Sequence, residues 1–169
     1  TLYDGVSAAG ETVLTVWIPF FLGRALYRRP DELATLFGIV VVAMLAYSPL
    51  VLFELRMSPQ LHHLVYGFHQ HEFFQTYRGG GWRPMVFTSH GLTLAQFVLF
   101  AAVGAVGLWR ARRRALGVAS GPAAAYLALL LLSLKSLGAA VYGALVMPAV
   151  ALARPLRQLR LALVVAFLS

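Results

Sequence analysis

The segment LATLFGIVVVAMLAYSPLVLF, residues 33–53, decides the fold of this chain. It holds no charged side chain, and an α-helix needs about 20 apolar residues to cross the roughly 30 Å of hydrocarbon in a bilayer. The first carboxylate after it is Glu54. We therefore predict a transmembrane helix over residues 33–53 that leaves the membrane at Glu54.

The composition agrees with a membrane protein rather than a soluble domain. Of the 169 residues, 60% are hydrophobic and 12% are charged, and the mean hydropathy is +0.75. A soluble domain of this size carries roughly a quarter charged residues. The chain has no cysteine, which excludes disulfides and thiolate metal sites.

Basic residues gather in short clusters between the apolar runs. The net charge is +8, from 14 Lys and Arg against 6 Asp and Glu. Nine of the basic residues lie in three clusters, at 28–29, 110–114 and 154–160. This distribution is typical of cytoplasmic loops in membrane proteins. Because no basic face with interleaved aromatic residues is present, we expect the lipid bilayer as a partner and no nucleic acid.

Further apolar runs complete the predicted fold. Six membrane segments are expected, at 12–27, 33–53, 86–109, 122–134, 138–153 and 161–169. As one helix, the stretch 122–153 would be about 48 Å long, which is too long for a single crossing. Lys135 lies in its middle, so we predict two short helices that form a broken hairpin. The predicted fold class is all-α, a polytopic transmembrane helix bundle in a single domain over residues 1–169.

The one long polar segment is residues 55–84, which we expect on the face opposite the arginine clusters. It contains four of the five histidines and the Gly79–Gly81 triplet. Thr1 is expected in a loop, and Ser169 ends the chain inside an apolar run. We therefore expect an internal fragment of a longer, multi-pass protein.

Four side chains near this loop are candidates for binding an anion. Arg78 and Arg83 bracket Gly79–Gly81; glycines permit close approach, and the arginine fork matches phosphate oxygens. Lys135 lies at membrane depth in the predicted break, where an ionisable group usually faces a cavity or a partner. His90, one turn into a predicted span, is placed to face the same cavity.

The other histidines do not indicate a metal site. They are His62, His63, His69 and His71. Their spacing matches no zinc signature, and only Glu72 offers carboxylate support. We expect no metal and no cofactor, with these rings packing and hydrogen-bonding near the membrane interface.

Two other charged positions have simple interpretations. Arg24 lies one turn before Arg28 and can extend to the cytoplasmic headgroups. Glu54 and Arg56 are placed to pair with each other and to anchor the loop.

Three motifs resemble the bacterial O-antigen ligase and O-antigen polymerase superfamily, membrane glycosyltransferases that act on undecaprenyl-diphosphate-linked glycans. Residues 17–26, WIPFFLGRAL, resemble an aromatic span that ends in Gly-Arg. Residues 83–97, RPMVFTSHGLTLAQF, resemble a loop-to-helix motif, with His90-Gly91 in place of its Pro-Asn. Residues 133–139, SLKSLGA, resemble a Ser-Arg-Ser break, with lysine in place of the arginine.

The resemblance implies an enzyme of the bacterial inner membrane that ligates or polymerises surface polysaccharide, as in lipopolysaccharide biosynthesis. It implies that Arg83, and with it Lys135, holds the lipid diphosphate. It also places essential residues, including a histidine proposed as catalytic, in a periplasmic loop after Ser169. Residues 1–169 alone are therefore not expected to be active, and the choice between ligase and polymerase stays open.

Two other functions fit the sequence. A transporter or channel would use Lys135 and Arg24 along a pathway shaped by the broken helix, and an inverted repeat of the spans would favour it. A metal-dependent membrane hydrolase would depend on the loop histidines, and it would require stoichiometric metal in the purified protein.

Overall fold

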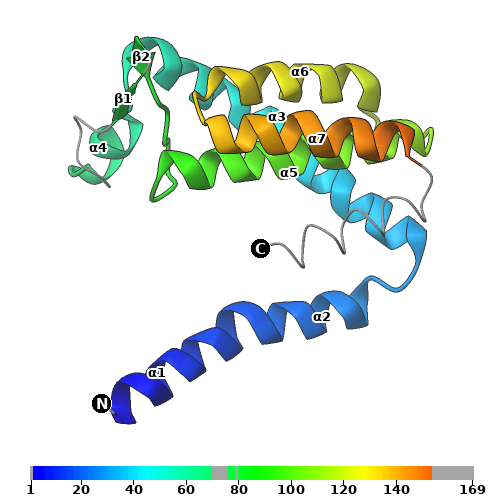
Figure 1. The fold of residues 1–169 in the computed structure, drawn as a ribbon, viewed down its shortest axis with the longest axis horizontal. Coiled ribbons are helices and arrows are strands. Elements are labelled where there is room, and N and C mark those ends of the chain that lie inside the picture. The colour runs from blue at the N-terminus through cyan, green and yellow to red at the C-terminus, as the bar shows by residue number, and fades with distance from the viewer. Residues whose placement is uncertain (1, 70–75, 79, 154–169) are drawn as a thin grey trace. The chain divides into compact units, whose positions relative to one another are not determined.

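The computed structural model describes residues 2–69, 76–78 and 80–153, and these residues are mostly helical (Figure 1). By length and composition, three helical segments could cross a membrane, at 3–26, 30–57 and 91–110. The chain forms two compact units, residues 1–36 and 37–169. The predicted segment 161–169 lies outside the described residues.

The first unit is a helical rod followed by a turn. It consists of α1 (Leu2–Thr12), the π-helix η1 (Val13–Trp17) and α2 (Ile18–Leu26), which follow one another directly. Pro19 has no N–H, and the helix widens just before it, where the N–H of Ile18 donates to the carbonyl of Val13. The helix itself begins at Leu2, before the predicted membrane span 12–27, and Asp4 lies in its first turn, where an acidic side chain is favourable.

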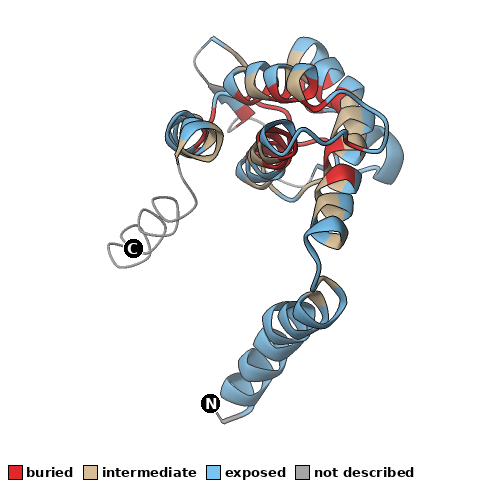
Figure 2. Cartoon of the chain, turned by 90° about the vertical axis from the view of Figure 1, so that its right-hand side faces the viewer, coloured by how far each residue is buried: buried red, intermediate tan, exposed pale blue. Residues whose placement is uncertain are grey.

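Three helices form the core of the second unit. The central helix, α5 (Gly91–Arg110), packs against both α6 (Ser120–Ser133) and α7 (Leu137–Leu152). α6 and α7 run antiparallel to each other beside it (Figure 1), and Figure 2 shows the buried residues gathered in this unit. Small residues bring these helices close, since a Cβ added at Gly143 would lie 2.8 Å from Cδ2 of Leu131. The break between α6 and α7 falls where the sequence predicted it.

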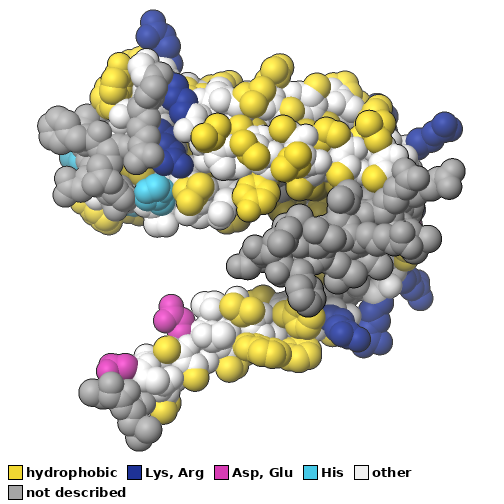
Figure 3. Space-filling view, viewed as in Figure 1, with side chains coloured by type: hydrophobic (Ala, Val, Ile, Leu, Met, Phe, Trp, Pro, Cys, Tyr) yellow, Lys and Arg dark blue, Asp and Glu magenta, His cyan; other side chains and the backbone are white. Residues whose placement is uncertain are grey.

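The outward face of α6 and α7 is apolar. Leu129, Leu132, Leu145 and Leu152 are between 63% and 82% exposed. Figure 3 shows hydrophobic side chains across this face, with lysine and arginine toward the ends of the helices. Soluble monomers rarely expose so many large apolar side chains on one face. Such exposure is expected where helices face lipid.

The longest helix, α3 (Pro30–Met57), contains the predicted span 33–53 and extends it at both ends. Pro49 lies inside it and deprives the carbonyl of Leu45 of its helical donor. The hydroxyl of Ser48 donates to that carbonyl at 2.7 Å, and the hydroxyl of Tyr126 donates to Ser48 at 2.8 Å. The irregular turn of α3 therefore becomes its contact with α6.

A small hairpin adds strands to a fold that was predicted as all-α. β1 (Tyr77–Arg78) and β2 (Gly81–Trp82) pair antiparallel, with Tyr77 opposite Trp82. The rings of these two residues lie edge to face, with their centroids 5.1 Å apart. A short helix, α4 (Leu61–Tyr66), precedes the hairpin. Two-residue strands carry too little alternation to be seen in a sequence.

Candidate functional site

Lys135 occupies the break between α6 and α7. Its backbone has φ of 53°, the left-handed region that usually ends a helix at glycine. The side chain is exposed, and its Nζ lies against Gly81 of β2, where an added Cβ would overlap it. A residue at the end of α6 thus reaches the hairpin that follows α4.

The hairpin also carries the two predicted arginines. Arg78 pairs with Gly81 in the strand register. Arg83 follows β2 directly, and its N–H donates to the carbonyl of Thr76 at 2.7 Å. Because a strand rises about 3.3 Å per residue, Gly81 and Arg83 lie within about 7 Å of each other along the backbone.

The Arg83 side chain is buried, with 8% of its surface exposed. It lies across the first residue of α5, where a Cβ added at Gly91 would be 2.9 Å from Nε and 3.0 Å from Cδ. Glycine at this position therefore makes room for the arginine. The packing confines Cγ, Cδ and Nε of Arg83 against the N-terminus of α5.

His90 is the N-cap of α5. Its Nδ1 accepts a hydrogen bond from the N–H of Leu92 at 3.0 Å, and its carbonyl accepts one from the hydroxyl of Thr88 at 3.0 Å. The helix therefore begins at Gly91, whereas the sequence predicted a span that starts at Val86. Residues 86–90 form a turn, in which Val86 has a positive φ of 52°.

A buried carboxylate holds this turn in place. Glu54, with 1% of its surface exposed, accepts the N–H groups of Met85 at 2.9 Å and Val86 at 2.7 Å on Oε2. Its Oε1 accepts the N–H of Leu61 at 3.0 Å. The predicted pairing of Glu54 with Arg56 is wrong, because both carboxylate oxygens bind backbone amides of other segments. A lone carboxylate at the end of an apolar span was the signal for this role.

The four predicted site residues thus lie around one hairpin. We call Arg78, Arg83, His90 and Lys135 the hairpin cluster. Arg83 and Lys135 bring two positively charged side chains to it, so the cluster favours an anion with several oxygens. Its bond to Leu92 makes Nδ1 of His90 an acceptor, so in the neutral ring Nε2 carries the proton and can donate.

The other predicted positions lie elsewhere. Arg24 is exposed in the last turn of α2, in the first unit. His62 bonds through Nδ1 with the carbonyl of Phe68 at 2.9 Å, and His63 stacks on His69 at 4.6 Å. His71 lies outside the described residues, so the expected lack of a metal stays a prediction.

Comparison of the chain with models of protein families, with curated proteins and with solved structures found no match.

Proposed function

We propose that the chain is part of an integral membrane glycosyltransferase that ligates or polymerises surface polysaccharide from an undecaprenyl-diphosphate-linked donor. The resemblance of residues 83–97 and 133–139 to O-antigen ligases and polymerases motivates the proposal. One observation supports it most. Arg83 and Lys135, 52 positions apart in the sequence, reach the same hairpin.

The chemistry of such a transfer suits the hairpin cluster. An acceptor hydroxyl attacks the anomeric carbon of the donor sugar, the bond from that carbon to the diphosphate oxygen breaks, and negative charge grows on the diphosphate. Fixed cations at that position stabilise the transition state more than the ground state. Arg83, which is packed on Gly91, supplies a guanidinium on a confined side chain, and the exposed Lys135 supplies an adaptable ammonium.

His90 fits this task as a hydrogen-bond donor. Its Nδ1 is engaged by Leu92, so Nε2 is the nitrogen that can donate to a phosphate oxygen. A general base to accept the hydroxyl proton must be an acceptor. We therefore assign the base to no residue of the hairpin cluster.

The test follows glycan transfer by the full-length protein in membranes. Arg83→Ala should lower the transfer rate by at least about 100-fold, the scale of lost transition-state stabilisation in other enzymes. Arg83→Lys should restore only part of the rate, because the bidentate fork is lost. Arg56→Ala removes an exposed charge outside the hairpin cluster and should leave the rate within about twofold.

Glycine substitutions test the geometry without removing charge. Gly81→Ala should displace the Lys135 ammonium and lower the transfer rate. Gly138→Ala is the matched control, since its Cβ would meet nothing within 4 Å. Near-normal transfer by both Arg83→Ala and Gly81→Ala would refute the proposal.

A further inference from the structure

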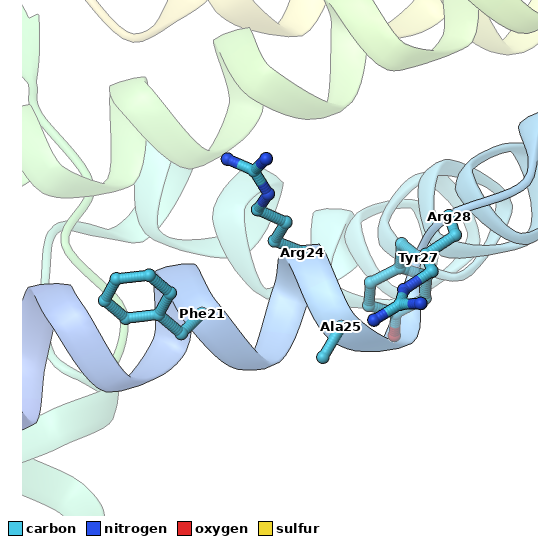
Figure 4. Close-up of a pocket in the computed structure, with 5 residues that line it drawn as sticks. All are labelled: Phe21, Arg24, Ala25, Tyr27 and Arg28. Atoms are coloured by element: carbon cyan, nitrogen blue, oxygen red, sulfur yellow. The ribbon is translucent and has the colours of Figure 1, made fainter.

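The first unit has a pocket of its own at the end of α2. It has a volume of about 590 Å³ and is lined by Phe21, Arg24, Ala25, Tyr27 and Arg28. In Figure 4, Arg24 projects from the side of α2, and Tyr27 and Arg28 lie beyond its last turn. The pocket thus combines two guanidinium groups with two aromatic rings.

The carboxylate of Glu32 bonds to the backbone beside this pocket and not to a guanidinium group. Oε2 of Glu32 accepts the backbone N–H groups of Arg28 and Arg29, each at 2.9 Å. These bonds fix the turn that leads into α3 and direct the carboxylate at the backbone. Among the described residues, neither Arg24 nor Arg28 has an ion pair, so both guanidinium groups are available to a ligand.

The position of the pocket indicates which anion it meets. The helical segment 3–26 is long and apolar enough to cross a membrane, and it ends at the pocket. Phe20, Leu22 and Leu26 expose 54% to 64% of their surface along its last turns. An apolar span that ends in tyrosine and arginine places these groups at the depth of lipid headgroups.

We propose that Arg24 and Arg28 form a binding site for the phosphate of an anionic phospholipid, with Tyr27 beside the headgroup and Phe21 against the first acyl carbons. Arginine is suited to this because its fork can take two phosphate oxygens at once. A zwitterionic lipid brings its own cation to the headgroup, so it is held less tightly. This site is independent of the hairpin cluster and of the proposed glycan transfer.

The experiment is native mass spectrometry of the full-length protein in detergent, titrated with phosphatidylglycerol or with phosphatidylcholine of the same acyl chains. The wild-type protein should retain phosphatidylglycerol in preference to phosphatidylcholine. Arg24→Gln with Arg28→Gln should weaken phosphatidylglycerol binding by about tenfold or more, on the scale of charge-assisted hydrogen bonds. Arg29→Gln is the matched control, because it removes the same charge next to the pocket but not from its lining, and it should change binding by less than about twofold.

Three outcomes would overturn the site. An equal loss with Arg29→Gln would show diffuse attraction by the basic segment, and equal retention of both lipids would show no headgroup recognition. Displacement of the lipid by millimolar inorganic phosphate would show a site for a soluble anion. A supporting outcome comes from replacing Arg24 and Arg28 together by lysine. This variant should bind phosphatidylglycerol more weakly than the wild type but more tightly than the double glutamine variant, because the charge remains and the fork is lost.

Discussion

Glu54→Gln should destabilise the second unit by about 2–3 kcal/mol. The wild-type carboxylate accepts three backbone N–H groups, at 2.7, 2.9 and 3.0 Å. A glutamine can keep its oxygen toward Met85 and Val86, but its amide N–H₂ then faces the N–H of Leu61. The variant loses one charge-assisted bond, worth about 1.5–3 kcal/mol, and weakens the other two. For a protein of this size, that corresponds to a fall in Tm of about 4–12 °C.

Thermal unfolding of the purified protein in detergent measures this effect. Glu32→Gln is the matched control, since both of its bonds go to one exposed oxygen and a glutamine oxygen can keep them. Its Tm should fall by no more than about 2 °C. Limited proteolysis should show faster cleavage of residues 58–61 and 84–90 in the Glu54 variant only. A Glu54→Gln protein that melts within about 1 °C of the wild type would refute the reasoning.

Lys135→Gly should raise the free energy of unfolding by up to about 1 kcal/mol, since glycine relieves the positive φ of 53°. The same variant should lower glycan transfer because the ammonium is gone, and a thermal melt and a transfer assay on one sample would show whether the two effects separate. His90→Ala should cost about 1 kcal/mol through loss of the α5 cap, and His90→Asn should retain most of it, as a thermal melt will show. Arg110→Gln should destabilise the end of α7, because Nη1 of Arg110 donates to the carbonyls of Val150 at 2.6 Å and Ala153 at 2.5 Å. Amide hydrogen exchange in the last turn of α7 should then be faster than in the wild type. A reporter fused after Arg112 should lie in the cytoplasm, as its basic cluster predicts, and a periplasmic signal would contradict the topology.

The features predictable from the sequence are those with a local cause. The uncharged run 33–53 predicts α3, because a continuous apolar segment of that length has few alternatives to a helix. The polar residues around Lys135 predict the break between α6 and α7. Both patterns lie within the segments that they describe.

The features that could not be predicted depend on distant partners. The turn at 86–90 needs Glu54, whose bonds to Met85 and Val86 join residues 31 and 32 positions apart. No periodicity within residues 83–97 reveals that partner. For the same reason, the sequence predicted an ion pair of Glu54 with Arg56, the nearest opposite charge along the chain. The predicted topology placed Arg83 and Lys135 on the same face of the membrane. The contact of Lys135 with Gly81 and that of Arg83 with Gly91 could be identified only in the structure.

The short lengths of α6 and α7 have a consequence for the surrounding lipid. At 1.5 Å per residue, their 14 and 16 residues extend about 21 and 24 Å, against about 30 Å of hydrocarbon. A hairpin of this height that enters from one leaflet ends about 6–9 Å below the opposite boundary of the hydrocarbon. If α6 and α7 lie in a bilayer, the bilayer must thin there or admit water, which would give the ammonium of Lys135 an aqueous approach. Bilayer thickness then becomes a physical control on this chain, and shorter acyl chains should match it best.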